Sequence, residues 1–285
     1  MKEVLKSIQV VLKEVGLYQG KIDGLIGCKT YYSVITLKEK NDLKKAKKDI
    51  QKILADNRLY FGEIDGIFGG NSMSAFNHAI PAPKITDDLL IRIQKNCALG
   101  FAGNINQYAD KYHIKTKADL CAFIANIIHE SNGFNNLREN MNYSASRLVQ
   151  VFPKYFKSLV SARSIVAQGQ VAIADVVYGG RMGNGKDNGD GFAYRGGGLI
   201  HLTGKRNYTL ASIGTGVEDL LVKHPELIIQ SEHAVKTAMW FWLNNRCSGY
   251  ANKGEFDQVC RVVNGGNNGL AHRRELHQKA WNVLF

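Results

Sequence analysis

Residues 8–27 of this 285-residue chain recur as residues 50–69, at an offset of 42 positions. The identical pairs are Ile8/Ile50, Gln9/Gln51, Leu12/Leu54, Leu17/Leu59, Tyr18/Tyr60, Gly20/Gly62, Ile22/Ile64, Asp23/Asp65, Gly24/Gly66 and Gly27/Gly69. Self-similarity of this kind indicates two copies of one small structural unit.

Each copy has the pattern of two short helices joined by a glycine-rich turn. In the first copy, apolar residues recur at helical spacing from Ile8 to Val15. The turn reads Gly-x-Ile-Asp-Gly-x-x-Gly, and glycine permits the positive φ values that tight turns need. Thr30 and Ser72 stand where a side chain could cap the second helix of each copy.

Pro81 and Pro83 mark the predicted domain boundary, because their spacing favours an extended, semi-rigid connector. The predicted segments are a module at 1–80 with copies at about 1–40 and 43–80, a linker at 81–85 and a larger domain at 86–285. In the larger domain Thr86 can cap a helix, helical periodicity recurs and strand signals are scarce. The predicted fold class is therefore mainly α.

The charge of the chain limits its partners. Lys plus Arg total 37 and Asp plus Glu total 25, a formal net charge of +12 that attracts polyanions such as nucleic acid and bacterial wall polymer. The excess is spread along the chain, and the densest run, residues 44–48, lacks the aromatic platform of single-strand binders. We predict no nucleic-acid partner and interpret this run as a solvated helix face or linker.

The cysteines, histidines and apolar segments exclude further classes. Five cysteines without a C-x-x-C pair argue for free, mostly buried thiols, and no H-E-x-x-H spacing occurs, so we predict no metal and no cofactor. Residues 1–16 mix apolar with charged side chains, unlike a signal peptide, and nowhere do about 18 apolar residues run together. We expect a monomer made in the cytoplasm without stable membrane insertion.

Glu130 is the first candidate catalytic residue, because it follows a strongly apolar helix. The stripe of that helix consists of Leu120, Phe123, Ile124, Ile127 and Ile128. At about 100° per residue Glu130 projects from the edge of the stripe, and we expect it to be half removed from water. A carboxyl in such surroundings suits a general acid near neutral pH.

Glu139 is the second candidate. In one continuous helix the carboxyls of Glu130 and Glu139 would lie about 13 Å apart along the axis and on different faces. The sequence Ser131-Asn132-Gly133 stops helices, so the chain can turn there and bring Glu139 back across a cleft. This permits the separation of roughly 6.5–9.5 Å that an inverting glycosidase needs between its carboxyls.

Four sequence blocks surround these residues. They are His129-Glu130-Ser131-Asn132-Gly133-Phe134, Glu139-Asn140-Met141-Asn142-Tyr143-Ser144, Tyr194-Arg195-Gly196-Gly197-Gly198-Leu199-Ile200-His201-Leu202-Thr203-Gly204 and Asn264-Gly265-Gly266-Asn267-Asn268-Gly269-Leu270. Their composition and order strongly resemble glycoside hydrolase family 19, in particular its phage and bacterial endolysin branch. The pattern Leu-Tyr-x-Gly-x-Ile-Asp-Gly-x-x-Gly of the repeats resembles the small helical peptidoglycan-binding modules found beside wall-lytic enzymes.

The resemblance to family 19 implies an α-helical, lysozyme-like fold and roles for several residues. Glu130 would be the general acid and Glu139 the base that activates water. Thr203 inherits the role of positioning that water. His201 stands where the family has Gln, and substrate contact and loop packing are equally open for it.

Other positions match family contacts with substrate. Asn207 and Asn264 match positions that contact sugar or water, although Asn before Gly-Gly is more often a turn former. Tyr143 and Tyr194 could stack on sugars, although aromatic residues at helical spacing are usually core. Residues 196–198, all glycine, are either a flexible turn or a backbone that approaches a sugar.

The resemblance of the repeats implies that residues 1–80 dock on the cell wall. The candidate wall-binding residues are Tyr18, Asp23, Tyr60 and Asp65. For the two Asp residues taken individually, hydrogen bonds within their own turns are the simplest interpretation.

These expectations describe an inverting endolysin that cleaves the β-1,4 bond between N-acetylmuramic acid and N-acetylglucosamine of peptidoglycan. Because no signal peptide is evident, it would reach the wall of a phage-infected host through a holin pore. The alternatives are a chitinase, a lytic transglycosylase that uses a single Glu, and a non-catalytic wall-binding virion protein.

Overall fold

The computed structural model describes residues 1–284, and helices account for 58% of the chain. Within these residues the backbone forms isolated β-bridges and no β-strand, so the predicted mainly α fold class is confirmed. The chain divides into two compact units. Unit 1 comprises Met1–His129 and Trp242–Phe285, and unit 2 comprises Glu130–Phe241.

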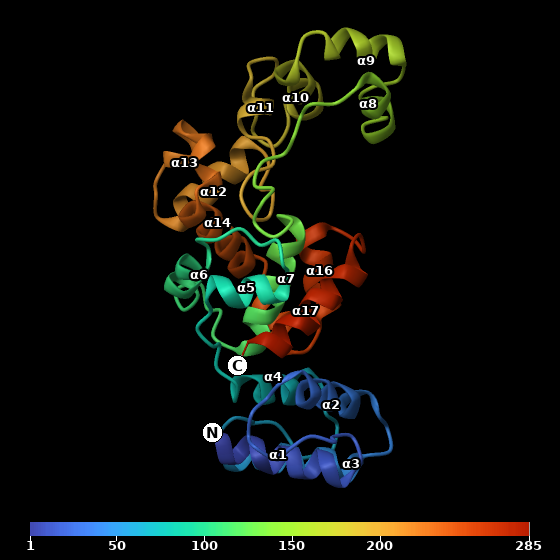
Figure 1. The fold of residues 1–285 in the computed structure, drawn as a ribbon, viewed down its shortest axis with the longest axis vertical. Coiled ribbons are helices and arrows are strands. Elements are labelled where there is room, and N and C mark those ends of the chain that lie inside the picture. Colours follow the sequence, from blue (N-terminus) through green and yellow to red (C-terminus); the bar gives the residue numbers. More distant parts are fainter. Residues whose placement is uncertain (285) are drawn as a thin grey trace. The chain divides into compact units, whose positions relative to one another are not determined.

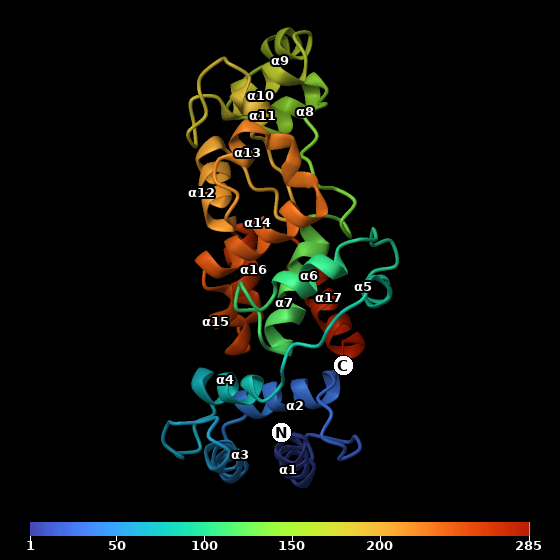
Figure 2. The same cartoon turned by 90° about the vertical axis from the view of Figure 1, so that its left-hand side faces the viewer.

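The repeated segments form four helices of unit 1. They are α1 (Lys2–Glu14), α2 (Cys28–Glu39), α3 (Lys44–Asp56) and α4 (Gly70–His78). Helix α1 packs beside α3, and α2 and α4 lie together on the same side of that pair (Figures 1 and 2). The related helices of the two copies are thus neighbours.

A buried glutamine ties the first copy together. Gln9 is 0% exposed, and its Nε2 lies 3.2 Å from Asp23 Oδ1 and 3.3 Å from Thr30 Oγ1. Its Oε1 accepts the Gly24 N–H at 2.8 Å. One side-chain amide therefore links the first helix, the turn and the second helix.

Gln51 makes the equivalent contacts in the second copy. Its Nε2 lies 3.0 Å from Asp65 Oδ1 and 3.2 Å from Ser72 Oγ, and its Oε1 accepts the Gly66 N–H at 2.8 Å. A buried amide left without partners would cost stability. This requirement explains why Gln, Asp and Gly recur together in the repeat.

The two predicted helix caps are wrong. Helix α2 begins at Cys28 and α4 at Gly70, each after a glycine that makes no side-chain cap bond. Thr30 and Ser72 therefore lie inside the first turns, where they are buried and contact the central glutamines.

The four candidate wall-binding residues stabilise the turns. Each Asp accepts the N–H two residues ahead, at 2.9 Å for Asp23 and 2.8 Å for Asp65, and these bonds lower the pKa of both carboxyls. The hydroxyls of Tyr18 and Tyr60 donate to backbone carbonyls at 2.7 and 3.0 Å. The interpretation that both Asp residues bond their own turns is confirmed, whereas contact with the wall stays a prediction.

Helix α7 (Lys117–Glu130) is the central helix of unit 1. It is buried on every side from Lys117 to Ile128, not only along the predicted stripe, and the polar side chains of Lys117, Asp119 and Asn126 are buried with it. Lys117 Nζ donates to Ile26 O at 2.8 Å, and Tyr31 stacks on Trp281 with ring centroids 3.9 Å apart. The first repeat therefore packs directly on the core helices.

The other helices of unit 1 are α5 (Asp87–Ile93), α6 (Ala102–Tyr108), α15 (Cys247–Asn252), α16 (Phe256–Asn264) and α17 (Leu270–Val283). The predicted linker, residues 81–85, lies inside this unit, and the Asn106 side chain bonds the Ile85 backbone at 2.9 and 2.7 Å. Thr86 accepts the Leu89 N–H, so the predicted cap of α5 is confirmed. The domain boundary at 81–85 stays a prediction about independent folding.

Unit 2 has two small cores. Its helices are α8 (Ala145–Val151), α9 (Leu159–Val166), α10 (Gln170–Tyr178), α11 (Asp190–Ala193), α12 (Lys205–Thr215), α13 (Leu220–Lys223), η1 (Pro225–Ile229) and most of α14 (Ser231–Asn244). One core gathers around α8, α9 and α10, and the other around α12, α13 and η1. Long loops connect the two cores and carry the candidate site.

All five cysteines are free and four are buried, which confirms the prediction of mostly buried thiols. No helix formed by residues 1–284 combines the length and apolar character needed to cross a membrane.

Asp119 should make the stability of unit 1 depend on pH. Its carboxyl is 0% exposed and accepts the Trp242 Nε1–H at 2.7 Å, and burial raises its pKa to about 7. The unfolded chain loses this proton near pH 4, so the folded state becomes progressively less favoured between about pH 4 and 7. The full cost, of the order of a few kcal/mol, applies above pH 7.

We therefore expect Asp119→Asn, which keeps the acceptor for Trp242, to raise the melting temperature more at pH 8 than at pH 5. The exposed Asp42→Asn serves as the control and should show no such difference. Calorimetry at both pH values checks this. An equal effect of Asp119→Asn at pH 5 and pH 8 would contradict the assignment.

Candidate active site

Helix α7 ends at Glu130, and the chain turns immediately afterwards. Three consecutive residues have positive φ, at 48° for Asn132, 69° for Gly133 and 66° for Phe134. The Asn136 N–H donates to Ser131 O at 2.8 Å, which closes the turn. The predicted turn at Gly133 is confirmed, and Glu130 and Glu139 do not belong to one straight helix.

Glu130 is half-buried, as expected of a residue at the edge of the apolar helix. The turn after it is anchored by Phe134, which is 2% exposed and whose N–H donates to Ser131 Oγ at 2.8 Å. The end of α7 is thereby fixed, and so is the position from which the Glu130 side chain projects.

Glu139 lies in an extended segment that pairs with residues 196–198. The Glu139 N–H donates to Gly196 O at 2.8 Å, and the Gly198 N–H donates to Leu137 O at 2.9 Å. Gly197 in turn forms an antiparallel bridge with Leu202. This short ladder places Glu139 opposite the glycine segment.

Two donors hold the Glu139 carboxylate. The Tyr178 hydroxyl donates to Oε1 at 2.7 Å, and the Gly196 N–H donates to Oε2 at 3.0 Å. A carboxylate has about four lone-pair positions, so each oxygen can still accept another hydrogen bond. Glu139 is therefore oriented and still able to accept a proton from water.

Two partly buried tyrosines, Tyr178 and Tyr143, feel the negative charge of the Glu139 carboxylate. Burial, followed by the hydrogen bond to Glu139, raises the pKa of Tyr178 far above its ordinary value. Burial and the charge of Glu139 also raise the pKa of Tyr143, which places this candidate substrate residue near the carboxylate. Both phenols stay neutral donors at physiological pH.

The three glycines at 196–198 are closely surrounded. A Cβ at Gly196 would lie 3.2 Å from His201 Nδ1 and 3.3 Å from Glu139 Oε2, and one at Gly197 would lie 2.5 Å from Tyr208 Oη. Side chains fill the space that a larger residue would need at Gly196 and Gly197. The two interpretations of this segment, a flexible turn and a backbone that approaches a sugar, both stay predictions. The group that the backbone approaches at Gly196 is the Glu139 carboxylate.

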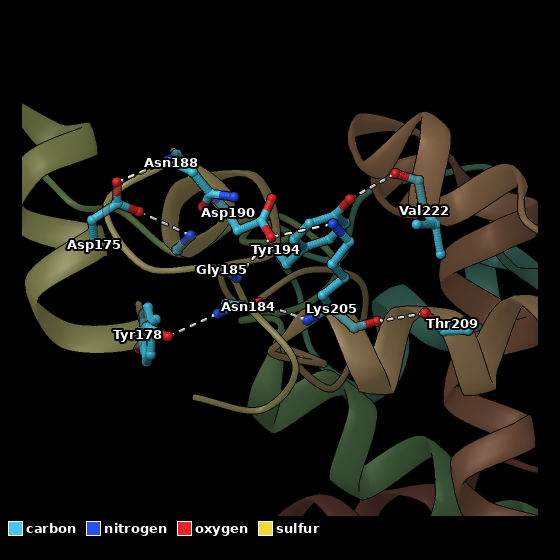
Figure 3. A network of polar contacts seen from close by, with 12 residues as sticks. Asp175, Tyr178, Asn184, Gly185, Asn188, Asp190, Tyr194, Lys205, Thr209 and Val222 are labelled. Carbon is cyan, nitrogen blue, oxygen red and sulfur yellow. Dashed lines mark hydrogen bonds and ion pairs between the residues drawn. The ribbon is translucent and has the colours of Figure 1, made fainter. Parts of the chain in front are cut away.

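A polar network fixes the end of α10, which carries Tyr178 (Figure 3). Asn184 Nδ2 donates to Tyr178 O at 3.0 Å, and Asn184 Oδ1 accepts the Lys205 N–H at 2.8 Å. Asp190 accepts the Gly185 N–H at 2.8 Å and pairs with Lys205 Nζ at 3.2 Å. The loop after α10 is thereby fastened to the start of α12.

Thr203 and its neighbours form a compact corner. The Thr203 hydroxyl donates to His201 O at 2.8 Å, which leaves its oxygen lone pairs able to accept from water. Asn207 Nδ2 donates to Thr203 O at 2.7 Å, and His201 Nε2 lies 3.1 Å from Asn136 O. His201 and Asn207 thus pack the loops in this structure, and their contact with substrate stays a prediction.

The two other candidate substrate residues each make packing contacts of their own. Tyr194 is 5% exposed, and its hydroxyl donates to Val222 O at 2.8 Å, so this ring belongs to the second core of unit 2. Asn264 ends α16 in unit 1, where its Nδ2 donates to Asn268 O at 3.3 Å. This bond within its own turn supports the turn-forming interpretation of Asn264, whereas its contact with sugar or water stays a prediction.

Tyr178 was not among the sequence candidates. It ends a helix before Gly179-Gly180, and nothing in that pattern distinguishes it from a core tyrosine. Arg138 was missed as well; its guanidinium donates to Tyr208 Oη at 3.0 Å and Pro225 O at 2.8 Å, next to Glu139 in the chain.

Among residues 1–284 no three His, Cys, Asp or Glu side chains gather in a way that could hold a metal ion. The chemistry that the described site can support is proton transfer between carboxyl groups, water and substrate.

Comparison with profiles of known protein families finds no match. The chain is 35% identical over 175 residues to a "Glycosyl hydrolase family 19 domain-containing protein" of Haemophilus influenzae, covering 61% of this chain and 84% of that protein. It is 42% identical over 66 residues to an acidic endochitinase of Petunia hybrida, covering 23% of this chain and 22% of that one. Among solved structures, chitinase C from Streptomyces griseus aligns with a TM-score of 0.44 and 20% identity over 71% of this chain and 93% of that chain.

The crowding at Gly197 predicts a loss of stability on substitution. We expect Gly197→Ala to destabilise the protein by about 1–3 kcal/mol, because its Cβ would lie 2.5 Å from Tyr208 Oη and 2.6 Å from Ile228 Cγ2. Gly103→Ala is the control, since no atom lies within 4 Å of a Cβ at that helical position. Thermal unfolding checks this, and equal stability of the two variants would show that the packing around Gly197 can relax.

Proposed function

Because the chain belongs to glycoside hydrolase family 19, a family of glycosidases, we propose that it hydrolyses bacterial peptidoglycan. The bond cleaved is the β-1,4 linkage between N-acetylmuramic acid and N-acetylglucosamine, with inversion at the anomeric carbon. The observation that carries this proposal is the Glu139 carboxylate, held by Tyr178 and Gly196 just beyond the turn that follows Glu130.

The proposed mechanism uses two carboxyl groups. Glu130 donates its proton to the glycosidic oxygen as the bond to the anomeric carbon breaks. Glu139 removes a proton from the attacking water, which adds to the opposite face of the sugar ring. The Thr203 oxygen accepts a hydrogen bond from that water. The proton from Glu130 completes the hydroxyl of the leaving sugar, and the water oxygen, after losing a proton to Glu139, becomes the anomeric hydroxyl of the other.

Two features favour peptidoglycan as the substrate. The N-terminal repeats resemble wall-binding modules, and the net charge of +12 favours polyanionic wall polymers. The biological role that follows is lysis of a host cell by an endolysin that leaves the cytoplasm through a holin pore. The similarity to an acidic endochitinase favours chitin, a polymer of N-acetylglucosamine, as the second candidate substrate.

Digestion of purified peptidoglycan tests the proposal. We expect soluble fragments whose masses include one added water, and a rate that falls by about 10²–10⁴ in Glu130→Gln and in Glu139→Gln. Glu218→Gln, an exposed site of unit 2, serves as the control.

Three other outcomes of this assay would each indicate one of the alternative functions. Anhydro sugars that survive Glu139→Gln would indicate a lytic transglycosylase. Cleavage of chitin oligomers without cleavage of the wall would indicate a chitinase. Wall binding without any product would indicate a non-catalytic wall protein.

Tyr178 should act as a positioning residue for Glu139. We expect Tyr178→Phe to lower kcat by about 10- to 100-fold with little change in KM, since it removes the 2.7 Å bond to Oε1 and keeps the aromatic ring. The control is Tyr112→Phe, whose buried hydroxyl has no hydrogen-bond partner among the described residues. Steady-state kinetics on soluble glycan checks this, and an unchanged kcat would exclude the role.

A further inference from the structure

Unit 1 contains a cavity of about 990 Å³. It is bounded by α2 of the first repeat on one side and by α15, α16 and α17 on the other. A volume of this size lies within the range of small-ligand sites. None of the candidate catalytic residues lines it.

The walls of the cavity are aromatic and rigidly packed. Tyr32, Tyr250 and Phe256 line it as half-buried side chains. Phe256 stacks on His277 with ring centroids 4.1 Å apart and an interplanar angle of 13°. Such rings offer flat apolar surfaces beside polar groups, which suits the alternating apolar and hydroxyl faces of a sugar.

His277 contributes no positive charge to the cavity. Burial lowers its pKa to about 3, so the ring is neutral. Its Nε2 accepts the Trp281 Nε1–H at 3.1 Å, which leaves the proton on Nδ1, 3.3 Å from Tyr32 Oη. The imidazole therefore serves as a fixed support for Tyr32 and Phe256.

The charged residues of the cavity give it the opposite sign to the chain. Its carboxylates are those of Glu39, Glu255, Asp257 and Glu275, and its guanidiniums those of Arg261 and Arg274. Arg274 is already paired, since its Nε and Nη2 donate to the two oxygens of Asp257. Glu275 pairs with Lys279 at 2.6 Å. Within residues 1–284, no ion pair is formed by Glu39 or Glu255. The carboxylates of Glu39 and Glu255 then remain beside one guanidinium, that of Arg261, which leaves a small negative charge complementary to a cationic group.

We propose that this cavity binds the peptide-bearing disaccharide of the cell wall, with its free amino group at Glu39 and Glu255 and its sugar against Tyr250 and Phe256. The stem peptide supplies a primary amine, and the disaccharide supplies the apolar ring faces. Helix α2 of the proposed wall-binding module forms one side of the cavity. That the ligand is wall material rests on the proposed function.

A second wall site in the chain would raise the effective concentration of glycan near the enzyme. When the cavity holds the polymer, binding of the same polymer at the active site becomes an intramolecular event. We therefore expect the cavity to increase activity on intact walls more than activity on short soluble glycans.

Calorimetric titration of the full chain with a purified disaccharide tetrapeptide tests the proposal. This ligand ends in N-acetylmuramic acid and contains no muramic acid to glucosamine bond, so its binding is measured independently of hydrolysis. We expect Glu255→Gln and Tyr250→Ala each to weaken binding about 10-fold, and acetylation of the ligand amine to do the same. The control is Glu63→Gln, an exposed site of the second repeat outside the cavity.

The exposed Glu39→Gln provides a second variant in case Tyr250→Ala unfolds the cavity. Undiminished binding in the cavity variants, or equal binding of the acetylated ligand, would overturn the proposal. So would tighter binding of a glucosamine oligomer, which carries an amine on every sugar. Wall cleavage is measured separately, in the digestion assay. A wrong catalytic assignment would show there, and a wrong binding site would show in the titration.

Discussion

The backbone pairing between residues 137–139 and 196–198 holds the candidate active site together. Gly196 accepts the N–H of Glu139 and donates its own N–H to the Glu139 carboxylate, so one residue fixes both the backbone and the side chain. The neighbouring Gly197 leaves no room for a side chain, because a Cβ there would meet Tyr208 and Ile228. The glycine segment is thus a packing requirement of the site.

A second constraint organises the repeats in unit 1. Gln9 and Gln51 are each buried and each fix a turn through the same set of contacts. The turns in turn define where α2 begins, and α2 forms one side of the acidic cavity. Each copy of the repeat therefore depends on one buried amide, and the proposed wall-fragment site depends on that of the first copy, Gln9.

Local features were predictable from the sequence, and long-range ones were not. The turn after Glu130 followed from Ser131-Asn132-Gly133, since consecutive residues with turn propensity determine it. The contact of Tyr178 with Glu139 joins positions 39 residues apart, and no local pattern specifies such a pairing. Tyr194 was a candidate because an aromatic ring can stack on a sugar, yet the second core of unit 2 buries it, because burial depends on tertiary packing.

The central claim is that Glu130 and Glu139 act on opposite faces of one glycosidic bond. Proton NMR of the first product released from a soluble β-1,4-linked glycan tests it most directly, before mutarotation mixes the anomers. The two-carboxylate mechanism with a water between base and sugar predicts the α-anomer as the initial product. Initial release of the β-anomer would require a covalent or substrate-assisted route and would contradict the assignment of Glu139 as the base.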